Sequence, residues 1–220
     1  MTSNGIKAII FDMDGVLIDS EPSWQQAEFE TMQALGLPLS YEDTLQTTGL
    51  RIDQVVSYWY QRYPWANYDN ANTAKAIVDK VVAQIKQNGS AMKGVENALN
   101  YCRQHHYHIG LATSSSTAII EAVLNKLQIG QYFNAIQSAE DLRYGKPHPE
   151  VYLLCAQQLG IAPHQCLAIE DSFNGLIAAK AANMQTCIIP AAEQAQQARW
   201  VLAEHQLANL DQLAELLLAN

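Results

Sequence analysis

Two carboxylates lie two residues apart near the start of the chain. Asp12 and Asp14 follow the apolar run 8–11 directly, and Gly15 comes next. Carboxylates this close repel each other and lose solvation beside a buried segment, which costs free energy unless a cation or a bound group offsets it. The pair therefore indicates a site that holds a cation or a charged reaction partner.

Three further polar clusters also follow apolar runs. They are the hydroxyl cluster 113–116, the lysine turn 145–149, and an acidic pair with a serine at 170–172. Hydroxyls and free backbone N–H groups before a helix suit an anion, and Lys146 adds a positive charge. Taken alone, the hydroxyl cluster and the lysine are explained more simply by a helix cap and an exposed turn, and each acidic pair equally well by caps or turns. Four clusters in order after successive apolar runs instead favour one functional site.

The elements that position these clusters are predicted from apolar periodicity. Short apolar runs that stop at polar or turn-forming residues are typical of buried parallel strands. They are 8–11, 109–112, 135–137, 166–169 and 186–189. Apolar residues at helical spacing fill the gaps, in 95–102, 119–127, 151–159 and 176–182. This alternation predicts an α/β fold with a Rossmann-like, doubly wound parallel sheet, in which ligands bind beyond the carboxyl ends of the strands.

The gap after the first predicted strand differs from the others. Residues 20–89 contain helical patterns and no convincing strand, whereas an ordinary βα loop has about 2–6 residues. We therefore expect an α-helical cap domain, 20–89, inserted into a core made of 1–19 and 90–220. Its hinges are expected near 19–22 and 88–90.

Composition limits the classes of partner. The chain has 220 residues and a formal net charge of −9, which argues against nucleic acid or an anionic membrane surface as the main partner. No stretch approaches about 18 consecutive apolar residues, and the N-terminus lacks the pattern of a secretory signal. The four cysteines show neither paired nor zinc-type spacing. We expect a soluble, cytoplasmic monomer that acts on a small molecule.

The four clusters resemble those of the haloacid dehalogenase (HAD) superfamily of phosphotransferases. The pattern Asp-x-Asp-Gly-x-(Leu/Val) follows the first strand, the later Thr/Ser, Lys and acidic pair come in the family's order, and the resemblance covers essentially the whole chain. Within the superfamily the chain is similar to the β-phosphoglucomutase-like branch, and most to bacterial sugar and hexitol phosphatases of the 2-deoxyglucose-6-phosphate phosphatase type. The stretches 10–22, 49–53 and 146–149 carry that closer match.

This resemblance implies a Mg²⁺-dependent phosphatase and assigns roles to the acidic residues. Asp12 would be the nucleophile that forms an aspartyl phosphate, and Asp14 the general acid and base. Asp12, Asp14 through its backbone carbonyl, and Asp171 would bind the metal through oxygen, as Mg²⁺ prefers. Glu170 would be a further ligand or an acid behind the ligands.

The resemblance also implies which residues hold the phosphoryl group. Thr113 would donate its hydroxyl and Ser114 its backbone N–H to the phosphoryl oxygens. Lys146 would neutralise developing charge and hold Asp12. Thr113 replaces the serine that is common in this branch, but the hydroxyl remains.

The cap is expected to close over the crevice and to choose the leaving group. Glu21, Trp24 and Arg51 are the candidates for that choice. Arg51 could contact an anionic or hydroxyl-rich part of the substrate, although a surface ion pair explains it equally well. The expected substrate is a sugar or hexitol phosphate such as 2-deoxyglucose 6-phosphate.

Three other activities fit part of this pattern. A phosphosugar mutase would use the same core, but no cap lysine matching the mutase pattern is evident. A dehalogenase would need neither Asp14 nor magnesium. A two-component receiver domain also combines acids, a Thr/Ser and a lysine as a signalling switch, but it is much shorter and lacks a helical insertion after the first strand.

Overall fold

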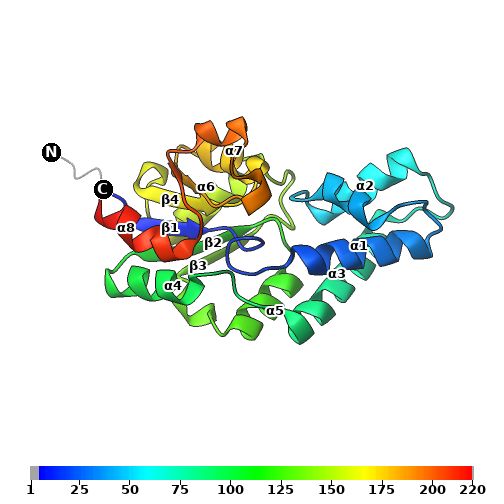
Figure 1. Cartoon of the computed structure of the whole chain (residues 1–220), viewed down its shortest axis with the longest axis horizontal. Helices are drawn as coiled ribbons and strands as arrows, with labels where there is room; N and C mark the ends of the chain where they lie inside the picture. Colours follow the sequence, from blue (N-terminus) through cyan, green and yellow to red (C-terminus); the bar gives the residue numbers. More distant parts are fainter. Residues whose placement is uncertain (1–4, 220) are drawn as a thin grey trace.

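The computed structural model describes residues 5–219, which form a parallel β-sheet with helices on both faces and a helical insertion at one end (Figure 1). Six strands lie in the order β3-β2-β1-β4-β5-β6, and every neighbouring pair is parallel. They are β1 Ala8–Phe11, β2 His108–Thr113, β3 Ala135–Ser138, β4 Cys166–Glu170, β5 Gln185–Ile188 and β6 His205–Gln206. The predicted doubly wound α/β fold is confirmed.

The five predicted strands are all present, with ends that differ by at most one residue from the prediction. The sequence did not predict β6, which has two residues and pairs with β5 through Cys187 and His205. Such a short strand carries no apolar run that would distinguish it from a loop.

Helices cover both faces because successive side chains of a strand point to opposite sides of the sheet. Ile9 and Phe11 of β1 belong to one core cluster, together with residues of the helices on the first face, α4 Val95–Gln104, α5 Thr117–Leu127 and α8 Leu213–Leu218. Ala8 and Ile10 belong to a second cluster, together with residues of α6 Glu150–Leu159 and α7 Phe173–Ala181. The central strand is therefore buried on both faces, which explains its continuous apolar run.

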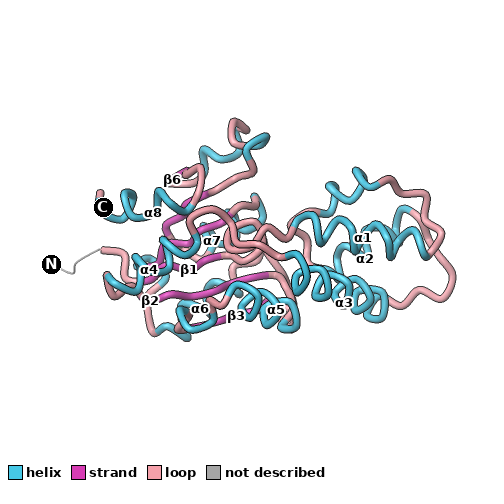
Figure 2. The backbone as a smooth tube through the Cα atoms, turned by 60° about the horizontal axis from the view of Figure 1, so that its bottom comes forward, coloured by secondary structure: helices cyan, strands magenta, loops and turns pink. Residues whose placement is uncertain are grey.

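All the regular elements between β1 and α4 are helices. It contains α1 Glu21–Ala34, α2 Ile52–Arg62, α3 Asn70–Asn88 and the 3-10 helix η1 Tyr41–Thr47. Ile77, Val81 and Ile85 of α3 are fully buried, as is Trp59 of α2, so these helices pack on one another. This insertion lies beyond the carboxyl ends of the strands (Figure 2).

Two chain segments connect the insertion to the sheet, and they run side by side. The backbone N–H of Asp19 donates to the carbonyl of Ser90 at 3.0 Å, and that of Met92 donates to Leu17 at 3.0 Å. An isolated antiparallel bridge joins Ile18 to Ala91 between them. The insertion thus begins and ends at one point beside the end of β1. No helix within residues 5–219 is long and apolar enough to cross a membrane.

Candidate active site

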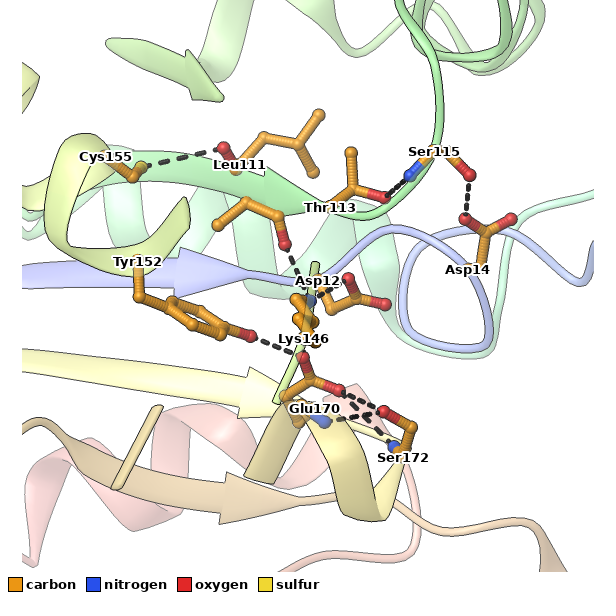
Figure 3. Close-up of polar contacts among 12 residues, drawn as sticks. Asp12, Asp14, Leu111, Thr113, Ser115, Lys146, Tyr152, Cys155, Glu170 and Ser172 are labelled. Carbon is orange, nitrogen blue, oxygen red and sulfur yellow. Dashed lines mark hydrogen bonds and ion pairs between the residues drawn. The ribbon is translucent and has the colours of Figure 1, made fainter. Parts of the chain in front are cut away.

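The polar residues at the strand ends meet in space because β1 lies between β2 and β4. Phe11 of β1 is in register with Leu111 of β2 and Ile169 of β4. Asp12 therefore emerges beside the ends of both neighbouring strands. Figure 3 shows the side chains that gather there, from the ends of these three strands and from the loop that precedes α6.

Lys146 is the centre of a buried ion-pair network. Its ammonium group donates to Asp12 Oδ1 at 2.5 Å, to Glu170 Oε1 at 2.6 Å and to the carbonyl of Ala112 at 3.0 Å. Burial opposes the charge of Lys146, but the charges and hydrogen bonds of Asp12 and Glu170 outweigh it and raise its pKa. The three side chains form a charge-paired unit in which the lysine stays protonated.

Glu170 is held by more partners than the sequence predicted. Tyr152 of α6 donates its hydroxyl to Oε1 at 2.5 Å, and Ser172 donates its hydroxyl to Oε2 at 3.1 Å. Tyr152 is fully buried and was missed by sequence reasoning. Its helix is apolar on that face, so the tyrosine is indistinguishable from a core residue until β4 is placed beside it.

Three acids gather where a cation could bind. Asp12, Glu170 and Asp171 each offer a carboxylate oxygen, and these oxygens lie within 4.8 Å of one another. Burial is the main cause that raises the pKa of Asp12 to about 8 and raises that of Asp171, and the neighbouring carboxylates add to it. Together the three would carry more negative charge than Lys146 alone neutralises. Hard oxygen donors in such a cluster fit Mg²⁺.

Gly15 allows the loop after β1 to approach this cluster. Its φ is +74°, a conformation that favours glycine, and a Cβ atom there would lie 2.1 Å from Asp171 Oδ2. Any larger residue would displace the Asp171 carboxylate. The glycine of the Asp-x-Asp-Gly pattern is thus explained by contact with the second acidic pair.

The Asp14 carboxylate lies apart from the three acids. Its Oδ1 accepts from the hydroxyl of Ser20 at 2.5 Å and from the indole N–H of Trp24 at 3.0 Å. Its Oδ2 accepts from the hydroxyl of Ser115 at 2.7 Å. Asp14 is therefore an oriented carboxylate, held by donors from the insertion and from the loop after β2.

The hydroxyl cluster lies at the end of β2, as expected. The Thr113 hydroxyl oxygen accepts from the backbone N–H of Ser115 at 3.0 Å, and Thr113 is buried. Ser116 precedes α5, and its buried hydroxyl has no hydrogen-bond partner among the described residues. Ser114 lies between them, next to the same helix N-terminus. Oriented hydroxyls at this helix start suit an anion.

Glu21 and Arg51 of the insertion, both predicted to select the leaving group, have different surroundings. Glu21 accepts from the hydroxyl of Thr48 at 2.8 Å and from the amide of Gln25 at 3.0 Å. Burial raises the pKa of Glu21, and the charges of nearby acids add to this. Arg51 donates to Asp53 and to backbone carbonyls of the core, so its guanidinium group is occupied by the protein itself.

Comparison with known sequences identifies similar proteins along nearly the whole chain. The sequence model of the haloacid dehalogenase-like hydrolases matches residues 9–189. Hexitol phosphatase B of Escherichia coli K12 is 42% identical over 213 residues, which cover 96% of each chain. The fructose-1-phosphate phosphatase YqaB of the same organism is 31% identical over 179 residues, 80% of this chain and 92% of that protein.

Solved structures show the same arrangement. CbbY from Rhodobacter sphaeroides, in complex with phosphate, superimposes with a TM-score of 0.84 and 25% identity, over 94% of this chain and 96% of that one. The β-phosphoglucomutase from Clostridium difficile gives a TM-score of 0.80 at 25% identity, over 94% of this chain and 93% of that one. Both likenesses span the sheet and the helical insertion.

Proposed function

Because the chain belongs to the haloacid dehalogenase-like hydrolases, we propose that it is a Mg²⁺-dependent phosphatase of sugar or hexitol phosphates that works through an aspartyl phosphate. The observation that carries this proposal is the buried Asp12–Lys146 pair at 2.5 Å, with a separately oriented carboxylate, Asp14, two residues along the chain. One acid is paired with a cation, and the other is oriented by hydrogen bonds apart from that pair.

Asp12 is proposed as the nucleophile. Its carboxylate oxygen attacks phosphorus, a new O–P bond forms, and the bond between phosphorus and the substrate oxygen breaks. Lys146 holds Asp12 in place, opposes the rise in its pKa that burial causes, and lowers the repulsion between two anions. Water then attacks the aspartyl phosphate, which releases inorganic phosphate and restores the carboxylate.

Asp14 is proposed as the general acid and base. It gives its proton to the departing substrate oxygen in the first step and takes a proton from the attacking water in the second. Ser20, Trp24 and Ser115 hold its carboxylate through the three hydrogen bonds described above. A fixed carboxylate can serve both steps from one position.

The acid cluster is proposed to bind the metal. Asp12 and Asp171 would supply carboxylate oxygens, and the backbone carbonyl of Asp14 stays a predicted further ligand. Glu170 is bonded to Lys146, Tyr152 and Ser172, which favours a supporting role beside the ligands. When bound, Mg²⁺ would supply positive charge that lowers the repulsion between the carboxylates and a phosphoryl group.

The phosphoryl oxygens are proposed to bind the Thr113 hydroxyl, the Ser114 backbone N–H and the Lys146 ammonium group. Thr113 ends β2 and Ser114 follows it, whereas Lys146 lies in the loop before α6 and donates to Asp12. Hydrogen-bond donors fixed in advance stabilise charge that develops in the transition state.

The leaving group is proposed to be a sugar or polyol, because Glu21, Gln25 and Thr48 form a polar network on the insertion that suits hydroxyl groups. Hexitol phosphatase B and the fructose-1-phosphate phosphatase, both similar in sequence, are named for substrates of this class. 2-Deoxyglucose 6-phosphate is one example. We also propose that the protein is a cytoplasmic monomer that does not bind nucleic acid or membranes.

A phosphosugar mutase is the second candidate, because a β-phosphoglucomutase shares the fold at 25% identity. Phosphate release from a panel of sugar, polyol and nucleotide monophosphates, with and without Mg²⁺, separates the two. We expect Mg²⁺-dependent release from a sugar or polyol phosphate that Asp14→Ala abolishes. Isomerised sugar phosphate without release would establish the mutase instead.

A further inference from the structure

Arg51 is bound on two sides by groups of the protein. It precedes α2, and its side chain is 12% exposed. Nε and Nη2 donate to the two carboxylate oxygens of Asp53 at 2.6 and 2.9 Å. Nη1 donates to the carbonyls of Ala139 at 2.9 Å and Leu142 at 2.7 Å. Four of the five guanidinium N–H groups are thereby used.

The loop that Arg51 contacts leads directly to the active-site lysine. Ala139 and Leu142 belong to the segment that connects β3 to Lys146. A Cβ atom on Gly145 would lie 3.5 Å from Cβ and Cδ of Arg51, so the arginine stem packs on the backbone beside Lys146. The loop that Arg51 contacts and Lys146, the partner of Asp12, are therefore adjacent in the chain.

A second close approach to the core lies two residues before Arg51. A Cβ atom on Gly49 would lie 3.6 Å from Cβ of Ser172, and Ser172 donates to Glu170. The segment 49–51 thus lies close to the loop that follows Glu170 as well as to the loop that leads to Lys146. Arg51 alone among these contacts combines an ion pair with hydrogen bonds to the core.

We propose that Arg51 is a positioning residue that locks the helical insertion onto the loop 139–145 and thereby holds Lys146 against Asp12. Asp53 fixes the plane of the guanidinium group through two parallel hydrogen bonds, which directs Nη1 at the two carbonyls. A lysine has a single nitrogen and cannot reproduce this bridge. The inference rests on the proposed phosphatase reaction, since that reaction gives the Lys146–Asp12 pair its role.

This lock makes a different prediction from substrate binding. A residue that binds a distal group of the substrate affects only the substrates that carry the group. A residue that positions Lys146 affects every substrate alike, because each needs the same phosphoryl site. The two roles also differ without substrate, since only the lock restrains the free enzyme.

The test compares Arg51→Lys and Asp53→Asn with wild type and with the control Arg62→Lys. Arg62 is the last residue of α2, with its guanidinium group 3.7 Å from the Tyr58 ring centroid, and has no role in the proposed site. Kinetics are measured with Mg²⁺ on one sugar monophosphate and one sugar bisphosphate. Amide hydrogen exchange of 139–145 is measured on the same proteins without substrate.

For Arg51→Lys we expect kcat/KM to fall by about tenfold to a hundredfold, equally on both substrates, with the loss mainly in kcat. Exchange in 139–145 is expected to accelerate. Asp53→Asn should change both quantities in the same direction but less, and Arg62→Lys should match wild type.

A loss confined to the bisphosphate, with wild-type exchange in 139–145, would overturn the lock and make Arg51 a substrate ligand. Wild-type rates and wild-type exchange would overturn it as well. If the wild-type enzyme releases no phosphate from either ester, the proposed function fails, and the exchange measurement still decides on the lock.

Discussion

Trp24 of the insertion donates its indole N–H to the Asp14 carboxylate of the core at 3.0 Å. The opposite carboxylate oxygen accepts from Ser115 at 2.7 Å. The proposed general acid and base is therefore held from two parts of the fold at once. The position of α1 relative to the sheet sets the direction of this carboxylate.

Trp24→Phe tests that relationship, because it removes the donor and keeps an aromatic ring. A hydrogen bond to a charged group is worth about 1.5–3 kcal/mol, so kcat is expected to fall by about tenfold to a hundredfold. Steady-state kinetics with Mg²⁺ measure this. Trp200→Phe is the control, since the Trp200 indole donates to the backbone carbonyl of Gln194 and not to Asp14. A wild-type kcat in Trp24→Phe would show that Ser20 and Ser115 suffice.

Tyr152→Phe tests the support of the acid cluster. The hydroxyl of Tyr152 donates to Glu170 in the core, so its removal leaves Glu170 with fewer donors. Losing a group that orients metal ligands typically costs about 10–100-fold in metal affinity or activity. We expect the Mg²⁺ concentration for half-maximal activity to rise within that range. Tyr132→Phe, whose hydroxyl donates to Asn100 in a different region, should leave it unchanged.

An unchanged Mg²⁺ requirement in Tyr152→Phe would indicate that Glu170 does not influence the metal ligands. Metal binding measured by calorimetry separates this from a loss in the chemical step. A normal Mg²⁺ affinity with a lower kcat would indicate that Tyr152 supports the Lys146 network and not the metal ligands.

The main elements of the fold could be predicted from local sequence because the sheet is buried on both faces. β1 and β4 are continuous apolar runs that end at acids, so each strand end was also a site prediction. β6 could not be predicted. It has two residues, and its pairing with β5 depends on how the chain returns after α7.

Residues of the site could be predicted where a reactive side chain comes directly after an apolar run or in a recognisable turn. Asp12, Lys146 and Glu170 follow the apolar runs or the turn that define the sheet edge, and the structure brings them together. Tyr152 lies in an apolar helix and gave no signal. The acceptors of Arg51 in the core are backbone carbonyls 88 and 91 residues away, a chemical group that every residue carries.

Lys146→Met is expected to destabilise the protein because it leaves Asp12 and Glu170 without their buried cation. Removing one partner of a buried ion pair costs about 3–5 kcal/mol. Urea unfolding of the metal-free protein measures this. The control is Lys75→Met, which removes an exposed pair with Asp79, worth about 0–1 kcal/mol. Equal effects of the two substitutions would show that the buried network adds nothing to stability.

Glu28 is a buried acid of the insertion that the proposed reaction does not use. It lies in α1 and is 5% exposed, and its Oε1 accepts from the Thr47 hydroxyl at 2.7 Å and from the Trp59 indole N–H. Burial raises the pKa of Glu28 from 4.5 to about 7, against the effect of these two hydrogen bonds. The folded insertion therefore binds this proton more tightly than the unfolded chain does.

The sign of the resulting pH dependence follows from this difference. Below pH 4.5 Glu28 is protonated in both states and costs nothing, whereas above about pH 7 it is ionised in both and the full cost of burying the charge applies. Stability should fall as pH rises between these values, by about 3 kcal/mol at most. Other titratable groups also change the stability with pH, so the contribution of Glu28 must be measured as a difference between wild type and a variant.

Glu28→Gln isolates this contribution, since the amide oxygen can accept both hydrogen bonds and carries no charge. We expect the variant to match wild type near pH 4 and to exceed it near pH 8, by up to about 3 kcal/mol in the free energy of unfolding. Urea unfolding at several pH values measures the difference, with Glu42→Gln as an exposed control. Parallel curves for wild type and Glu28→Gln would contradict the prediction, because a proton held at Glu28 must separate them as pH rises.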